Sequence, residues 1–185
     1  MDITKVLEAD HRQVEDLFAK ISRAEGSDRP PLIEELATSL RGHMDLEESE
    51  LYPNMGRVTG EESVEEANEE HDLTRKGLDD MISLAPDDPG FGAALDSVKA
   101  GVMHHVKEEE GEIFPALRKE GTVLVDIATP FMQRRLDLGM PMPASALAAA
   151  STKEELLHEA SNAEIKGASS MSKDELAEAL AAKMS

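Results

Sequence analysis

A segment of eleven residues that is rich in possible metal ligands occurs twice in the sequence. It covers residues 43–53 and recurs sixty-two residues later over 105–115, with five of the eleven positions identical and three conservatively replaced. In an α-helix, residues four apart differ by about 40° around the axis and about 6 Å along it. His43 can therefore share a metal site with Glu47, and the second copy contains the same pair.

The histidine pattern extends to two further segments. Each of four segments with helical periodicity has one histidine on its apolar stripe, and these are His11, His43, His71 and His105. A lone histidine on such a stripe is usually a hydrogen-bonded core residue. Four imidazoles and the carboxylates of Glu47 and Glu109, buried without partners, would cost roughly several kcal/mol per group. Metal coordination satisfies all six groups, so the sequence predicts a metal site.

The elements that position these residues are predicted to be helices. Aromatic and β-branched residues are sparse, and no segment alternates between apolar and polar with period two, which argues against strands. Helical periodicity covers about 2–25, 31–53, 61–84 and 91–119. Four long helices joined by short linkers predict an all-α fold built on an up-down-up-down four-helix bundle.

The chain beyond the bundle is predicted to contain smaller elements. An apolar run over 122–139, broken by Pro130, indicates a short extra helix, and the Pro- and Ala-rich stretch that follows indicates a linker. The last segment is predicted to be a small helix-loop-helix, with helix N-caps at Ser151 or Thr152 and at Ser172. The predicted domains are residues 1–120, 121–150 and 151–185.

Composition and charge restrict the chemistry and the partners. The 185 residues include no Cys, so any metal must be held by nitrogen and oxygen. The formal net charge of −20 opposes contact with phosphate backbones and anionic lipids, so we expect neither a nucleic-acid nor a membrane partner. No signal-peptide pattern occurs at the N-terminus, and no apolar run approaches the roughly 20 residues that span a bilayer. The sequence thus predicts a soluble, cytoplasmic protein.

The order His, His-xxx-Glu, His, His-xxx-Glu resembles the hemerythrin-like (HHE cation-binding) family. The similarity covers about residues 1–120, and its most specific segments are Asp10-His11-Arg12, 43–53, Glu70-His71 and 105–115. The resemblance implies two non-haem iron ions, oxo- or hydroxo-bridged, inside the bundle. It also implies iron-binding roles for six residues. His11, His43, His71 and His105 would be terminal ligands, and Glu47 and Glu109 would be bridging ligands.

The sequence departs from the oxygen-carrying members of that family at two positions. Those members have a further histidine four residues after His71, where this chain has Arg75. They also place the last carboxylate five residues after its histidine, which selects Glu110, whereas the internal repeat favours Glu109. Glu110 therefore stays as the alternative ligand. Because one nitrogen ligand is missing, more coordination positions are open, which favours redox chemistry over reversible oxygen carriage.

The resemblance to four-His, two-Glu members implies reaction with a small oxidant, which could be H2O2, O2 or NO. The leading expectation is catalase-like decomposition of hydrogen peroxide in oxidative-stress defence. One alternative is a non-enzymatic protein that binds or senses O2, NO or iron, and another is a structural bundle that holds zinc. The absence of Cys and the two bridging-type carboxylates favour iron or manganese over zinc.

Tyr52, the only tyrosine, is the candidate catalytic residue, and it corresponds to Phe114 in the second copy of the repeat. Its phenol could ligate iron or hydrogen-bond to an oxo bridge, and the alternative role is an aromatic plug. The ninth position after His43 lies about half a turn away on an ideal helix, although Pro53 can distort the helix end. Both roles therefore stay open.

The remaining acidic residues near the predicted ligands are expected to form a solvated face; they are Glu48, Glu50, Glu108, Glu110 and Glu112. His104 is rotated by about 100° from His105, so we expect it at the surface or behind the ligands.

The last 35 residues resemble the helix-loop-helix module at the N-terminus of Rho termination factor, which is related in shape to SAP modules. That resemblance implies nucleic-acid binding. However, the segment has four Lys, no Arg, seven acidic residues and no aromatic residue that could stack on a base. A protein partner or a role in stability is therefore the favoured expectation.

Overall fold

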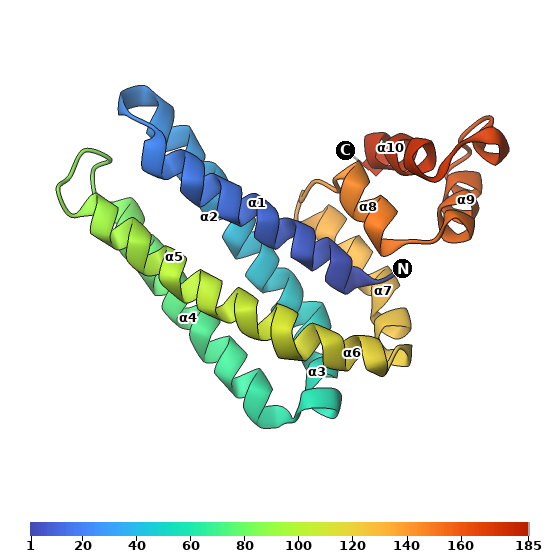
Figure 1. Ribbon diagram of the computed structural model, residues 1–185, viewed down its shortest axis with the longest axis horizontal. Coiled ribbons are helices and arrows are strands. Elements are labelled where there is room, and N and C mark those ends of the chain that lie inside the picture. Colours follow the sequence, from blue (N-terminus) through green and yellow to red (C-terminus); the bar gives the residue numbers. More distant parts are fainter. Residues whose placement is uncertain (185) are drawn as a thin grey trace. The chain divides into compact units, whose positions relative to one another are not determined.

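The computed structural model describes residues 1–184, with the side chains of residues 122 and 123 excepted. All regular secondary structure in this range is helical (Figure 1), which confirms the predicted all-α class. The chain divides into two compact units. One is Asp10–Glu120, and the other joins Met1–Ala9 to the segment that begins at Gly121.

Four long helices make up most of the first unit and run side by side in Figure 1. They are α1 (Ile3–Arg23), of which the part from Asp10 onward belongs to this unit, α2 (Arg29–Leu46), α4 (Glu61–Ser83) and α5 (Phe91–Glu108). The connections between successive helices are short, so neighbouring helices are antiparallel. Gly60, with a φ of 95°, makes the turn before α4, a conformation that residues with a Cβ rarely adopt.

Both α2 and α5 continue through a π-helical turn into a short α-helix. The π turns are Glu47–Leu51 and Glu109–Ile113, and the helices that follow are α3 (Tyr52–Thr59) and α6 (Phe114–Lys119). In each turn a backbone N–H donates to the carbonyl five residues earlier, from Tyr52 to Glu47 and from Phe114 to Glu109. The internal sequence repeat is thus also a structural repeat.

The helix that was predicted to end at Pro53 instead continues to Thr59. Pro53 is the second residue of α3 and directly follows the π turn, so its missing N–H coincides with the change in hydrogen-bond register. A proline after an acidic segment therefore marks a change of register here, and it does not mark the end of the helix.

The first unit has one apolar core, to which all four long helices contribute. On α1 the buried residues Val14, Leu17, Phe18 and Ile21 recur with the spacing of a helix face. Leu36 and Leu78 are completely buried in the same core. Each such side chain contributes roughly 1.5–3 kcal/mol by leaving water, so this core fixes the helices that present the polar cluster described below.

The second unit has four further helices and a 3₁₀ turn. They are α7 (Thr122–Asp137), α8 (Ala144–Ala150), α9 (Lys153–Asn162), the turn Ala168–Ser170, and α10 (Lys173–Met184). The Ala-rich stretch that was expected within a linker forms α8, and α7 is helical through Pro130. Within the described part of the chain, none of the helices is both long and apolar enough to cross a membrane.

The predicted N-caps at Thr152 and Ser172 are confirmed. The Thr152 hydroxyl accepts from the Glu155 N–H at 3.1 Å, and the Glu155 carboxylate accepts from the Thr152 N–H at 2.7 Å. Ser172 and Glu175 make the same reciprocal pair, at 3.2 and 2.6 Å. Each pair satisfies two backbone donors at a helix start, which fixes where α9 and α10 begin.

Candidate metal centre

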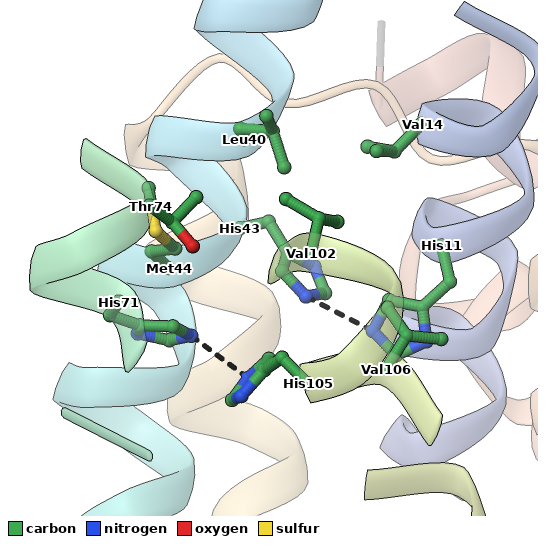
Figure 2. A pocket seen from close by; sticks show the side chains of 10 residues that line it. All are labelled: His11, Val14, Leu40, His43, Met44, His71, Thr74, Val102, His105 and Val106. Carbon is green, nitrogen blue, oxygen red and sulfur yellow. Dashed lines mark hydrogen bonds between the residues drawn. The ribbon is translucent and has the colours of Figure 1, made fainter. Parts of the chain in front are cut away.

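Each long helix of the first unit contributes one histidine to a common site (Figure 2). His11 of α1, His43 of α2, His71 of α4 and His105 of α5 point into the bundle and are at most 6% exposed. Their inner nitrogens form two pairs. The Nε2 atoms of His11 and His43 are 3.2 Å apart, and those of His71 and His105 are 3.1 Å apart.

Two glutamates lie between these pairs. Glu47 and Glu109 are completely buried, and each comes four residues after a histidine of the same helix. The Oε2 atom of Glu47 is 3.3 Å from His43 Nε2 and 3.4 Å from His71 Nε2. The Oε2 atom of Glu109 is 3.2 Å from His11 Nε2, and its Oε1 atom is 3.5 Å from His105 Nε2. Each carboxylate therefore faces one histidine of each pair, as a bridging ligand would.

The carboxylate oxygens of Glu47 and Glu109 make no hydrogen bond within the described structure. An ionised carboxylate that is buried without partners costs roughly several kcal/mol, so the site fits a cation better than it fits an empty core. Distances of 3.1–3.2 Å between nitrogens suit two ligands of one ion, because histidine–metal bonds are about 2.1 Å. Three groups of possible ligands occur among the described residues, and the two buried ones, His11, His43, Glu47 and Glu109 and then Glu47, His71 and His105, share Glu47, which fits two ions.

A carboxylate also faces the outer nitrogen of each histidine. The Nδ1 distances are 2.8 Å from His11 to Glu110, 2.8 Å from His71 to Glu48, 2.7 Å from His105 to Glu70 and 3.6 Å from His43 to Asp10. An Nδ1–H that donates outward leaves the Nε2 lone pair directed into the cluster. Hydrogen bonds to His11, His71 and His105 favour this tautomer, whereas His43 Nδ1 makes no hydrogen bond within the described structure.

Tyr52 lies inside the cluster. Its hydroxyl is 3.0 Å from His71 Nε2 and 3.3 Å from His105 Nε2, and its ring stacks on that of His71. The π turn explains this position, because it absorbs one extra residue and places Tyr52 about eight helical steps from His43, roughly 80° away. In the second copy of the repeat, Phe114 stacks on His11, so the hydroxyl belongs to one pair only.

The electrostatics of the cluster differ between its members. Burial disfavours the imidazolium of His11 and of His105, but nearby carboxylates outweigh burial and raise their pKa values to about 9 and about 10. Burial and the charge on His105 lower the pKa of His71 to about 4. Burial and the charge of Glu109 raise the pKa of Glu47. Burial alone would raise the pKa of Glu109, but the nearby His105 and His11 outweigh burial and lower this pKa.

The structure brings all seven predicted site residues together: His11, His43, Glu47, Tyr52, His71, His105 and Glu109. Their roles as ligands stay predictions. Glu110, the alternative to Glu109, lies outside the cluster against the outer face of His11. His104 is 61% exposed and lies 3.5 Å from Glu70 and 3.4 Å from Glu108, in agreement with a position behind the ligands.

Sequence reasoning missed the carboxylates on the outer nitrogens. Glu48 and Glu110 were expected on a solvated face, yet they are only 29% and 27% exposed and hold His71 and His11. A signal for them exists, because each directly follows a predicted ligand carboxylate in the repeat. Asp10 and Glu70 each directly precede a histidine, but each faces the histidine of a neighbouring helix, which spacing along one helix cannot reveal.

A small cavity of about 20 Å³ adjoins the cluster (Figure 2). Besides the four imidazoles it is lined by Thr74 and by apolar side chains, namely Val14, Leu40, Met44, Val102 and Val106. A volume of about 10–15 Å³ accommodates one water molecule, so the cavity has room for a ligand of one or two heavy atoms.

Comparison with known proteins identifies relatives of the first unit. Residues 2–117 match the family described as Hemerythrin HHE cation binding domain. A DNA nickase of Nostoc sp. (strain PCC 7120) is 30% identical over 122 residues, which are 64% of this chain and 34% of the nickase. An uncharacterised hemerythrin-like protein of Schizosaccharomyces pombe is 28% identical over 121 residues, 63% of this chain and 60% of that protein. No solved structure matches significantly.

We predict that Glu47→Gln separates metal binding from folding. Above a pH of about 8, where Glu47 is ionised in the metal-free protein, loss of its buried charge removes the repulsion with Glu109, so the free energy of unfolding should rise by roughly 1 kcal/mol. The same change should abolish most of the stabilisation that added Fe2+ gives. Urea unfolding with and without metal measures both effects, and Glu50→Gln in the same π turn is the matched control. A metal-free Glu47→Gln protein that is less stable than the metal-free wild type would contradict the role of Glu47 as a metal ligand.

We also predict that the metal-free protein loses stability as the pH rises above neutral. The raised pKa values of His11 and His105 contribute stability that is complete below 6.5 and is lost as the pH passes through about 9 and about 10. The raised pKa of Glu47 acts with the same sign. Thermal melting in the presence of a chelator should therefore give a lower Tm at pH 10 than at pH 7. His11→Gln should flatten this dependence, and a Tm that rises over the same range contradicts the prediction.

Proposed function

Because this chain belongs to the hemerythrin HHE cation-binding family, we propose that its buried histidine–glutamate cluster holds two iron ions and reacts with a small oxidant. The proposal depends chiefly on one observation. Four imidazole nitrogens converge on two carboxylates that have no other partner and that each face both histidine pairs. His11, His43, His71 and His105 would be terminal ligands, and Glu47 and Glu109 would bridge, which is the four-His, two-Glu type.

The formal charge around the cluster supports two divalent ions. Two carboxylates lie inside it, four more face the outer histidine nitrogens, and two guanidiniums pair with these outer carboxylates. These groups together have a charge of −4, which two divalent ions would neutralise.

We propose catalase-like decomposition of hydrogen peroxide as the reaction. When bound, a pair of iron ions supplies two-electron redox chemistry, which each half of the conversion of two H2O2 to two H2O and O2 requires. The cavity of about 20 Å³ limits the substrate to about two heavy atoms. The Tyr52 hydroxyl is directed at the His71–His105 pair, where it can ligate or donate a hydrogen bond to the oxidant. A role in oxidative-stress defence would follow.

A non-enzymatic role in binding or sensing O2 or NO is the second candidate. The observation that favours it is the lining of the cavity, in which Thr74 is the only polar side chain besides the imidazoles. Apolar walls suit an apolar diatomic molecule better than they suit peroxide, which needs hydrogen-bond partners. In this reading the C-terminal segment, which we propose to be a helix-loop-helix resembling the Rho N-terminal module, contacts a protein partner.

DNA nicking is not part of the proposal. The chain spans about a third of the Nostoc nickase and 60% of the Schizosaccharomyces protein, so the activity of either whole protein does not extend to it. A net charge of −20 further opposes contact with DNA.

The first experiment is an iron assay paired with an oxygen electrode. We expect about two iron ions per chain and visible absorption in the purified protein, and we expect dioxygen when peroxide is added. Protein that binds iron but releases no dioxygen would favour the binding or sensing role. About one zinc ion and no iron would contradict both candidates.

Tyr52→Phe tests the role of the phenol. If the hydroxyl ligates iron or hydrogen-bonds to the oxidant, its loss should change the visible spectrum and slow peroxide turnover by roughly 10- to 100-fold with the iron content retained. Phe114→Ala, at the equivalent position of the repeat, controls for loss of ring packing without loss of a hydroxyl. An unchanged spectrum and rate in Tyr52→Phe would leave Tyr52 with a packing role only.

A further inference from the structure

The geometry points to Arg75 and Arg12 as positioning residues that set the donor strength of one histidine at each of the two proposed ion positions. This inference depends on the proposed two-ion centre but not on the substrate that it uses. The inference gives a role to Arg75, which lies four residues after His71, at the position where the oxygen-carrying members of the family have a further histidine.

Arg75 holds the carboxylate that holds His71. Its Nη1 and Nη2 donate to the two oxygens of Glu48 at 2.8 and 2.9 Å, and Nη2 also donates to Asp45 at 3.2 Å. The same Glu48 Oε1 accepts from His71 Nδ1 at 2.8 Å. A two-point contact between guanidinium and carboxylate is strong and directional, so Glu48 cannot turn away from the imidazole.

Arg12 makes the corresponding contact on the other pair. Its Nη2 donates to Glu110 Oε1 in a short hydrogen bond, and that oxygen accepts from His11 Nδ1 at 2.8 Å. Arg12 Nη1 also donates to Glu15 at 2.8 Å. Arg12 is 53% exposed and Arg75 is 28% exposed, so solvent weakens the Arg12 contact more.

The two arginines occupy different places relative to their histidines. Arg12 directly follows His11, whereas Arg75 comes four residues after His71. The repeat that relates 43–53 to 105–115 therefore does not generate this pairing, although it does supply Glu48 and Glu110. Two unrelated sequence positions thus provide an arginine for each histidine pair, with a two-point contact from Arg75 and a one-point contact from Arg12.

The consequence concerns how strongly the histidines donate to a metal. A carboxylate that accepts from Nδ1–H increases the electron density at Nε2, and a guanidinium on that carboxylate reduces this effect. His105 has a different arrangement, because Glu70, which accepts from its Nδ1 at 2.7 Å, lies beside His104. The His71–His105 pair would then combine one moderated and one more basic imidazole. A moderated donor stabilises Fe2+ relative to Fe3+ and so raises the reduction potential.

Arg75→Gln tests this in the full-length, iron-loaded protein. We expect a lower midpoint potential in a spectroelectrochemical titration and roughly 10- to 100-fold weaker Fe2+ affinity in anaerobic competition with a chelator. Arg75→Lys restores the charge but not the two-point contact, so it should return most of the potential and only part of the affinity. Arg41→Gln is the matched control, because Arg41 is 50% exposed and pairs with Asp79 from α2 to α4 at 2.6 Å.

The outcomes separate this inference from the proposed function. Wild-type potential and Fe2+ affinity in Arg75→Gln would overturn it, as would equal shifts in Arg41→Gln. If Arg75→Gln does not fold, Arg12→Gln should shift the potential in the same direction by a smaller amount, and no shift there overturns the inference. Wild-type protein that binds no iron refutes the proposed centre. Wild type that binds iron but does not decompose peroxide refutes only the proposed reaction.

Discussion

The burial of two carboxylates between two pairs of imidazoles is the constraint on which the rest of the first unit depends. Glu47 and Glu109 are completely removed from water and make no hydrogen bond through their oxygens within the described residues. In the metal-free protein the raised pKa values of His11 and His105 let two imidazoliums face these carboxylates, and a bound cation would take over that role. The cluster is suited to a metal, and a bound ion would also link all four long helices through their own side chains.

The backbone is adapted to this cluster at two places. A regular α-helix that presents His43 and Glu47 inward would turn Tyr52 to the opposite side, and the π turn corrects that register within one residue. Pro53, the second residue of α3, directly follows this turn. The same device recurs in the second copy of the repeat, where it places Phe114 against His11. Irregular helix geometry is therefore what brings the aromatic residues to the site.

The sequence predicts much of the site because helix periodicity is a strong constraint. One histidine on each apolar stripe, and a glutamate four residues after two of them, were sufficient to identify the residues that converge. Residues whose place depends on contacts between helices could not be found in this way. Asp10 precedes His11 but faces His43, and Glu70 precedes His71 but faces His105. The rotation of Tyr52 was also out of reach, because π turns have no reliable sequence signal.

The repeat makes the two ion positions similar, and a few departures from it make them different. Each pair has one histidine from a copy of the repeat, His43 or His105, and one from a helix outside the repeat. Each pair also faces both carboxylates, so the two pairs would bind iron in nearly the same way. Tyr52 adds a hydroxyl to the His71–His105 pair, whereas Phe114 offers only a ring to His11. Two equal positions give an oxidant no preferred orientation. In the proposed two-iron centre, the Tyr52 hydroxyl would supply that preference, because it provides a proton donor beside a single pair.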